Sequence, residues 1–164
     1  MSSDLYLFHS ESTSVSAIAA FGKKLISVVF KTAEIYCLDP LIPEYMRAGF
    51  PFHYTNTKFV YGKSEEIPCK NNYFDVIISV NALDHVDNFS QSAKEIERIL
   101  KPGGKVRLHL HYHKQTITES IELNDEIVKS QFAFCSLAKI NESSSKMGYV
   151  LQNNSEKYAL WSNF

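Results

Sequence analysis

Two patterns of apolar residues alternate along the chain. Short apolar runs rich in β-branched and aromatic residues, as over 5–8 and 73–80, predict buried strands. Apolar residues that recur every three or four positions, as over 15–29 and 89–100, predict amphipathic helices. Strands that alternate with helices predict an α/β domain, with a mostly parallel sheet and helices on both faces. Further strands are expected over 34–38, 58–61, 105–112, 132–140 and 158–164, and further helices over 43–48 and 116–131.

Two polar residues follow predicted strands at positions where α/β proteins bind ligands. The run 73–80 is nearly continuous apolar sequence, typical of a strand buried on both faces of a parallel sheet, and Asn81 follows it. Asp39 ends an earlier strand, just before Pro40. In open α/β sheets ligands bind beyond the carboxyl ends of strands, so Asp39 and Asn81 are candidate binding residues. The alternative is that each is an ordinary turn former.

The size and charge of the chain limit its function. Its 164 residues predict a single domain over 1–164. With 17 basic and 18 acidic side chains the formal net charge is -1, which provides no overall attraction to nucleic acid or to an anionic membrane. No apolar run approaches the roughly 18 residues of a membrane-spanning helix, and the first residues do not resemble a signal peptide. We therefore expect a cytoplasmic protein without a nucleic-acid or membrane partner.

Neither the cysteines nor the histidines make a complete metal site in the sequence. The three cysteines are widely spaced and contain no C-x-x-C, which predicts reduced thiols without a disulfide framework or a zinc ribbon. His109, His111 and His113 alternate along one predicted strand and share a face, and imidazole suits zinc, iron, copper and nickel. No carboxylate or cysteine lies close to them in the sequence. We expect an exposed strand end and no metal, with metal binding as the alternative.

The segment after the run 73–80 carries one candidate catalytic residue. His85 is a candidate general base, because imidazole titrates near neutral pH. The alternative is a structural histidine that packs against the loop or caps it. Glu95, Glu97 and Arg98 lie between the apolar positions of the next helix, so we expect them on its solvated face.

Three motifs follow one another within residues 62–107. They are the turn Glu65-Glu66-Ile67-Pro68, the run Phe-Asp-Val-Ile-Ile-Ser-Val-Asn-Ala-Leu-Asp-His-Val over 74–86, and Glu95-x-x-Arg98-x-x-Lys101-Pro102-Gly103-Gly104. In this order and spacing they resemble the class I S-adenosylmethionine-dependent methyltransferases, in particular the type 11-like branch that acts on small molecules.

The resemblance implies a fold, a cofactor and a reaction. The fold is a Rossmann-like, mostly parallel sheet of seven strands with only the last strand antiparallel. Its strand order is third, second, first, fourth, fifth, seventh, sixth. The cofactor is S-adenosylmethionine, the substrate is a small molecule, and Asp39 binds the cofactor ribose.

The first departure from the family lies after the first predicted strand. The family places a glycine-rich loop there, but residues 9–13 are His-Ser-Glu-Ser-Thr, and the first glycine is Gly22. The hydroxyls of Ser10 and Ser12 are therefore the candidate cofactor contacts in this segment. The acid within it, Glu11, would lie near the carboxylate of the cofactor, so we expect cofactor binding to be weakened.

The second departure is Lys63. Many relatives carry an acid there that accepts from the adenine amino group, so the backbone amides of Ser64 and Glu65 remain as candidate contacts. The chain also begins almost at its first predicted strand, and we expect it to lack the N-terminal helices that cover the site in relatives. Two functions stay open: a methyltransferase, or a catalytically inactive relative that binds another ligand or a protein partner.

Overall fold

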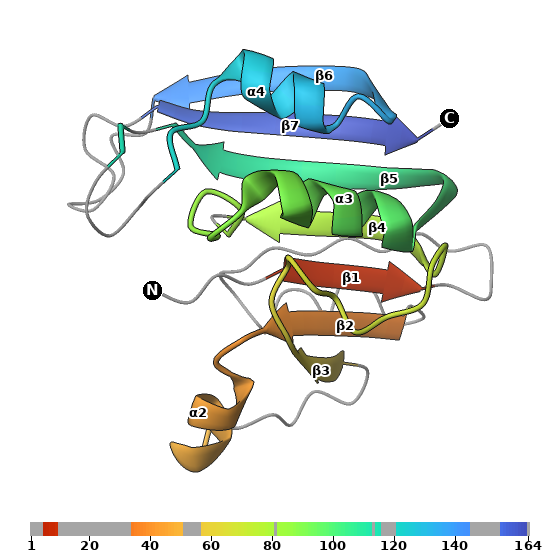
Figure 1. Ribbon diagram of the computed structural model, residues 1–164, viewed down its shortest axis with the longest axis vertical. Helices are drawn as coiled ribbons and strands as arrows, with labels where there is room; N and C mark the ends of the chain where they lie inside the picture. Colours follow the sequence, from red (N-terminus) through yellow and green to blue (C-terminus); the bar gives the residue numbers. More distant parts are fainter. Residues whose placement is uncertain are drawn as a thin grey trace.

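The sheet has the strand order that the resemblance implies. A computed structural model describes residues 5–9, 34–50, 57–80, 82–112, 114–115, 121–144 and 155–163. In this part of the chain seven strands form one sheet, in the order β3-β2-β1-β4-β5-β7-β6 (Figure 1). The strands are β1 (Leu5–His9), β2 (Glu34–Asp39), β3 (Thr57–Tyr61), β4 (Phe74–Val80), β5 (Leu100–His111), β6 (Cys135–Ser144) and β7 (Ser155–Asn163).

The strand β1 runs opposite to the expected direction. Leu5 pairs with Leu38 of β2 and with Ser79 of β4, both in antiparallel register. Among the described strands, parallel pairs are β2 with β3 and β4 with β5, while β7 is antiparallel to β5 and β6. The expectation that only the last strand is antiparallel was therefore wrong. An apolar run specifies which faces of a strand are buried, and that pattern is unchanged when the chain direction is reversed.

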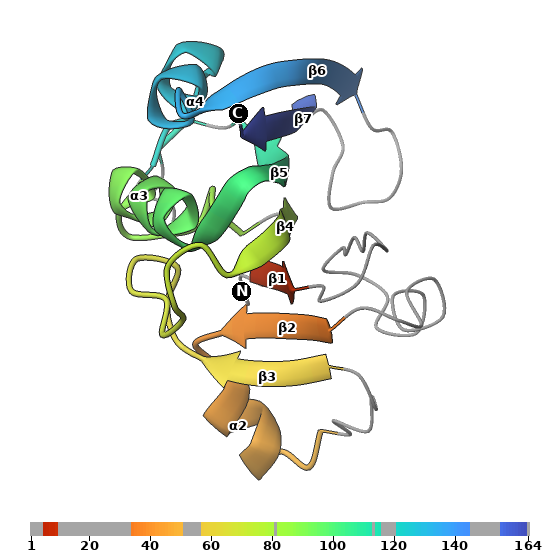
Figure 2. The ribbon, with the colours of Figure 1, turned by 90° about the vertical axis from the view of Figure 1, so that its right-hand side faces the viewer.

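The described helices are α2 (Ile42–Arg47), α3 (Phe89–Ile99) and α4 (Asp125–Gln131). Figure 2 shows α3 and α4 on the same face of the sheet and α2 beyond β3. The side chains of Asn88 and Asn124 cap α3 and α4 by accepting hydrogen bonds from backbone amides of the first turns, at 3.0 and 2.9 Å. The cap at Asn124 explains why α4 begins later than residue 116, where the apolar pattern started. None of these helices is long and apolar enough to cross a membrane.

The helix predicted over 15–29 lies outside the described residues. The presence of helices on both faces of the sheet therefore stays a prediction.

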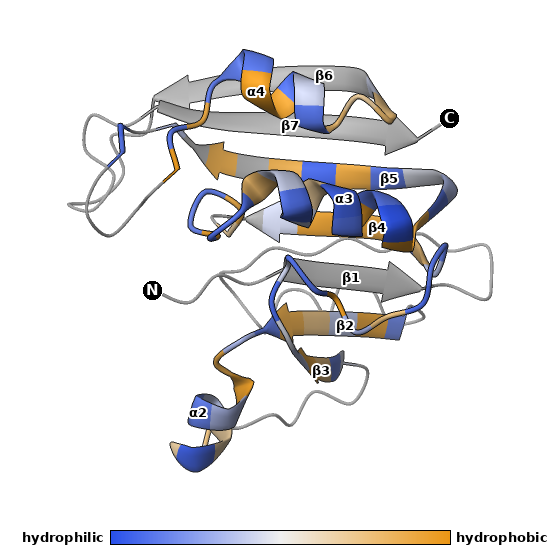
Figure 3. Cartoon of the chain, viewed as in Figure 1, coloured by the Kyte–Doolittle hydropathy of each residue, from blue (hydrophilic) through white to orange (hydrophobic). Residues whose placement is uncertain are grey.

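The strand β4 lies inside the sheet and is buried on both faces, as predicted. Ile77 and Ile78, which point to opposite faces, are 0% and 2% exposed. On the side of α3, Ile77 belongs to one continuous apolar core with Ile96 and Val106. Figure 3 shows polar residues of α3 on the side away from the sheet and apolar stripes on β4 and β5 behind it.

The first residues of β5, which follow α3, require glycine. Gly103 has a φ of 76°, which L side chains rarely adopt. A Cβ at Gly104 would lie 2.7 Å from Leu100 Cδ1 and 2.8 Å from the carbonyl oxygen of Lys101. The two glycines let the chain return from α3 and run parallel to β4.

The carboxyl ends of β2, β3, β4 and β5 lie at one edge of the sheet. The strands β2, β3, β4 and β5 share a direction, because β1 is antiparallel to both β2 and β4. Figure 1 shows the arrowheads of β2, β4 and β5 pointing the same way and that of β1 pointing the other way. At the end of β1, His9 pairs with Glu34 at the start of β2. The loops after β2, β3 and β4 therefore meet at the edge opposite to the end of β1.

Candidate binding site

A pocket of about 210 Å³ lies at this edge of the sheet. Its walls come from the end of β2, the turn after β3 and the loop after β4. Ligands of open α/β sheets bind in this position, beyond the carboxyl ends of the strands. The described residues that line it are Leu38, Pro40, Gly62, Lys63, Ser64, Glu65, Ala82, Leu83, His85, Val86 and Asp87.

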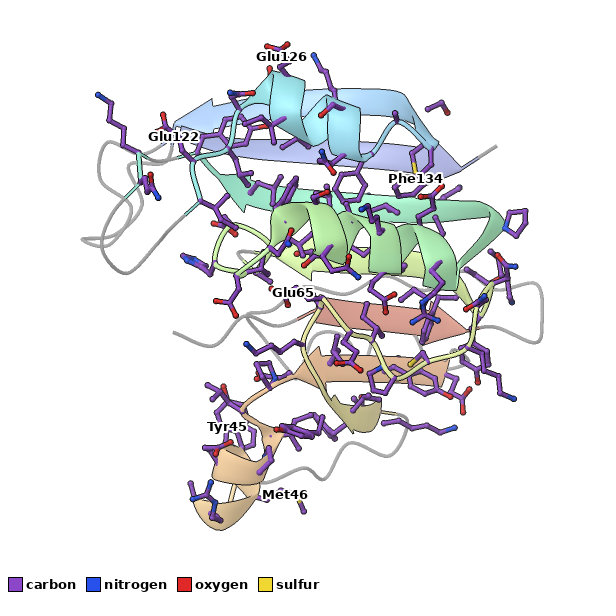
Figure 4. All side chains as sticks on the ribbon, in the orientation of Figure 1. Tyr45, Met46, Glu65, Glu122, Glu126 and Phe134 are labelled. Carbon is purple, nitrogen blue, oxygen red and sulfur yellow. The ribbon has the colours of Figure 1, made fainter. Side chains whose placement is uncertain are left out.

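Ser64 and Glu65 join the turn after β3 to the start of α3. Oε1 of Glu65 accepts hydrogen bonds from the backbone amides of Asp87 and Asn88, at 2.9 and 3.1 Å. The hydroxyl of Ser64 lies 2.8 Å from that of Ser92, which is fully buried. Figure 4 shows Glu65 at the tip of the turn, on the side toward α3. Both sequence-predicted residues thus line the pocket, and their side chains hold its wall in place.

An ion pair crosses the rim of the pocket. Lys63 Nζ lies 2.7 Å from Asp87 Oδ2, and the two side chains are 61% and 79% exposed. The hydrogen bond to Asp87 raises the pKa of Lys63. Asp87 was not predicted from the sequence, because its partner lies 24 positions earlier and no local pattern connects the two.

Asp39 forms a turn at the end of β2. Its side chain is 1% exposed, and Oδ1 accepts a hydrogen bond from the backbone amide of Leu41 at 2.7 Å. This is the turn-forming role left open by the sequence, and it directs the chain into α2. Its neighbours Leu38 and Pro40 line the pocket, whereas Asp39 is not among the lining residues. A contact between Asp39 and a ribose stays a prediction.

His85 lines the pocket next to a buried carboxylate. Its Nε2 lies 3.6 Å from Oδ2 of Asp84, which is longer than a hydrogen bond. The side chain of Asp84 is 1% exposed and that of His85 is 19% exposed. The backbone amide of His85 donates to the carbonyl of Ala82 at 3.1 Å, which turns the loop after β4 toward α3. The candidate general base therefore lies where a ligand of the pocket can reach it.

Glu95 and Arg98 of α3 form a clamp on the loop over 62–73. Arg98 donates to the carbonyls of Ile67 and Cys69, at 2.8 and 2.7 Å, and to both carboxylate oxygens of Glu95. Glu95 accepts from the backbone amide of Ile67 at 2.8 Å. The hydrogen bonds from Arg98 are the main reason why the pKa of Glu95 is lowered. The expectation of a merely solvated face was wrong for these two residues, whose side chains are 14% and 30% exposed.

Three predicted cofactor contacts cannot be placed in this site. Ser10, Ser12 and Asn81 lie outside the described residues. His9, the last residue of β1, pairs with Glu34 at the edge opposite to the pocket.

Metal ligands and reactive thiols do not gather at the pocket among the described side chains. No group of three or more His, Cys, Asp or Glu residues in that set could hold a metal ion. The backbone register pairs His109 with Tyr158 and His111 with Glu156, while His113 lies outside the described residues.

The thiols with resolved pKa shifts are not activated. Burial raises the pKa of the Cys69 thiol and raises that of Cys135 to about 12. Both thiols therefore stay protonated at neutral pH and are poor nucleophiles.

Comparisons with known proteins match this chain to methyltransferases. The family model described as "Methyltransferase domain" matches residues 19–108. The ubiquinone/menaquinone biosynthesis C-methyltransferase UbiE of Idiomarina loihiensis is 34% identical over 103 residues, which cover 63% of this chain and 36% of that protein. The sterol 4-C-methyltransferase strm-1 of Caenorhabditis elegans is 38% identical over 88 residues, which cover 54% and 25%. The chain thus spans about a third or less of the length of these relatives.

Similar solved structures share the fold. The Burkholderia thailandensis 1,6-didemethyltoxoflavin-N1-methyltransferase has a TM-score of 0.62 and 13% identity, with 90% of this chain and 69% of that one covered. A methyltransferase in complex with the Haloferax volcanii Trm112 activator has a TM-score of 0.59 and 15% identity, with 78% and 71% covered. At these identities the likeness concerns the fold alone, which is Rossmann-like as expected.

Proposed function

Because this chain belongs to the methyltransferase-domain family, we propose that it binds S-adenosylmethionine and transfers its methyl group to a small molecule. The observation that carries the proposal is the pocket at the edge where α/β sheets bind nucleotides. Pockets that enclose a whole ligand measure roughly 300–1,000 Å³. At about 210 Å³ this one suits the nucleoside part of the cofactor. A cytoplasmic location belongs to the same proposal.

The residues of the pocket fit a nucleoside. Leu38, Ala82, Leu83 and Val86 are buried apolar residues that offer an apolar surface to a planar base. Charged groups lie at the rim. Asp39 does not line the pocket, but it ends β2 between the lining residues Leu38 and Pro40, and we assign it to the ribose by this position in the fold.

The protein contributes to methyl transfer mainly by positioning. The bound cofactor supplies an electrophilic methyl group, and the acceptor atom must be held in line with it. We assign the role of general base to His85, which lines the pocket and whose imidazole can take a proton from the acceptor. The buried carboxylate of Asp84 lies beside Nε2 of His85, where positive charge develops when the ring takes that proton.

Calorimetric titration with S-adenosylmethionine and S-adenosylhomocysteine tests the proposal. We expect saturable heat with a dissociation constant below about 100 μM. Ala82→Phe places a ring in the pocket and should weaken binding at least about tenfold. Lys94→Ala, on the exposed side of α3, serves as the control and should bind like the wild type. Absence of heat from the folded wild-type chain would contradict the proposal.

A catalytically inactive binding protein is the second candidate, and the direction of β1 favours it. β1 ends at His9, which pairs with Glu34 at the edge opposite to the pocket, whereas the resemblance implies a first strand whose carboxyl end lies beside the cofactor. Such a protein would bind a nucleoside or a protein partner without transferring a methyl group. One similar structure was solved in complex with the Trm112 methyltransferase activator, so a protein partner is compatible with either candidate.

Adenosine distinguishes the two candidates in the same calorimetric experiment. An enzyme that holds the methionine end should bind S-adenosylhomocysteine at least about tenfold more tightly than adenosine. A nucleoside-binding protein should bind both equally.

A further inference from the structure

The rim of the pocket carries two groups with opposite hydrogen-bonding character. Lys63 in the turn after β3 and Asp87 in the loop before α3 both line the pocket, and Nζ lies 2.7 Å from Oδ2. An ammonium group only donates hydrogen bonds, and a carboxylate only accepts them. The rim can therefore distinguish ligands by whether they present a donor or an acceptor.

Asp87 is held in place through its backbone and its side chain. Its amide and that of Asn88 donate to the same oxygen of Glu65, at 2.9 and 3.1 Å. Asn88 in turn caps α3 by accepting from the amide of Gln91 at 3.0 Å. Lys63 bonds to one carboxylate oxygen of Asp87, Oδ2. The position of this carboxylate is thus set by two separate elements, the turn after β3 and the start of α3.

The carboxylate of Asp87 has further capacity to accept. A carboxylate offers about four lone-pair sites on its two oxygens. Among the described residues the hydrogen bond to Asp87 comes from Lys63 and goes to Oδ2, and the side chain is 79% exposed. Oδ1 can therefore accept from a ligand while the ion pair stays intact.

We propose that Asp87 makes the pocket selective for a purine with an amino group at position 6 over one with an oxygen there. This inference rests on the proposed function, because it names the residue that recognises the base of the nucleoside. Adenine presents an N–H donor at position 6, and a 6-oxo purine presents an acceptor. The carboxylate of Asp87 accepts a hydrogen bond from the 6-amino group and repels the oxygen of a 6-oxo purine. Lys63 acts as a positioning residue, because its ammonium group donates to Asp87.

The opposite selectivity would follow if Lys63 contacted the base directly. Its ammonium group would then donate to the oxygen of a 6-oxo purine. The 2.7 Å ion pair supports the first arrangement, because Lys63 is already bonded to the carboxylate.

Titration with S-adenosylhomocysteine and with its 6-oxo counterpart, S-inosylhomocysteine, tests the inference. We expect the wild type to prefer the first ligand at least about tenfold. Asp87→Asn keeps the shape but adds an N–H donor, and should reduce the preference to about twofold or less. Lys63→Met should keep a preference for S-adenosylhomocysteine. Glu66→Gln, an exposed acid of the same turn that does not line the pocket, should keep the wild-type ratio.

The outcomes separate this inference from the proposed function. An unchanged ratio in folded Asp87→Asn, or a wild-type preference for the 6-oxo ligand, overturns the inference and leaves the proposed function standing. A wild type that binds neither ligand overturns both. Thermal melting of each variant checks its folding, and Asp87→Ala replaces Asp87→Asn if the latter does not fold.

Discussion

The side chains of Glu95 and Arg98 hold the loop over 62–73 against α3. The guanidinium group is planar and carries five N–H donors, which suits simultaneous bonding to a carboxylate and to the carbonyls of Ile67 and Cys69. The same loop contains the turn that lines the pocket. The clamp therefore sets the position of one pocket wall although its own residues do not line the pocket.

Glu95→Gln should destabilise the fold in a pH-dependent way. The lost hydrogen bonds predict a decrease in unfolding free energy of about 1–3 kcal/mol at pH 7. The pKa of Glu95 is lowered in the folded state, so its stabilisation is present above the ordinary carboxyl pKa and is lost as pH falls through the folded value. The difference between variant and wild type should therefore shrink below about pH 4. Urea unfolding of the variant and the wild type at several pH values measures this difference in unfolding free energy.

Glu44→Gln is the matched control for this prediction. Glu44 also pairs with an arginine three residues later, Arg47, but their side chains are 49% and 74% exposed. Glu44→Gln should change the unfolding free energy by no more than about 0.5 kcal/mol. Equal effects of the two substitutions would contradict the role given to the clamp.

The site could be predicted from the sequence only as far as its residues follow strand ends or motifs. Ser64, Glu65 and His85 follow predicted strands, and all three line the pocket. The partners of Asp87 and the loop carbonyls that Arg98 contacts lie 22 to 31 positions earlier in the chain. No periodic pattern records contacts over such separations, so these two residues required the structure.

At the scale of elements, Ile77→Asp tests the burial of β4. Ile77 is 0% exposed, and a buried unpaired carboxylate costs several kcal/mol against a typical domain stability of about 5–15 kcal/mol. We expect loss of the folded state, seen as loss of the far-ultraviolet circular dichroism of the native chain. Lys105→Asp is the control, because Lys105 is exposed on β5 opposite Val76 and should remain folded. A native spectrum for Ile77→Asp would contradict the buried position.

The sequence predicts elements better than their directions. Continuous apolar sequence identified β4, and helical spacing identified α3 to within one residue of its observed end at Ile99. The direction of β1 was not predictable in the same way, because burial of alternate residues is identical for both directions. Parallel and antiparallel neighbours also differ little in the hydrogen bonds that each residue makes.

At the scale of the whole molecule, the sheet contains two parallel pairs, β2–β3 and β4–β5, with β1 between them, and β7 and β6 follow β5. The pair β4–β5 lies inside the sheet and next to α3 in the core. In the pair β2–β3, β3 is the outermost strand of the sheet. We expect the amides of β2 and β3 to exchange through a local opening of lower free energy than those of β4 and β5. Native-state hydrogen exchange at increasing denaturant measures both values. A single opening free energy for all four strands would contradict this expectation.

The position of β1 also determines the width of the pocket. One wall of the pocket belongs to the pair β2–β3, with Leu38 on β2 and Lys63 just after β3. The other wall, with Leu83 and Asp87, follows β4, and only β1 lies between β2 and β4. Two strand spacings, about 9.6 Å in total, therefore separate the walls at their base. A ligand that contacts both walls links the pair β2–β3 to the pair β4–β5 across β1. Its binding should hold β1 in place, and loosening of β1 should widen the pocket and weaken binding.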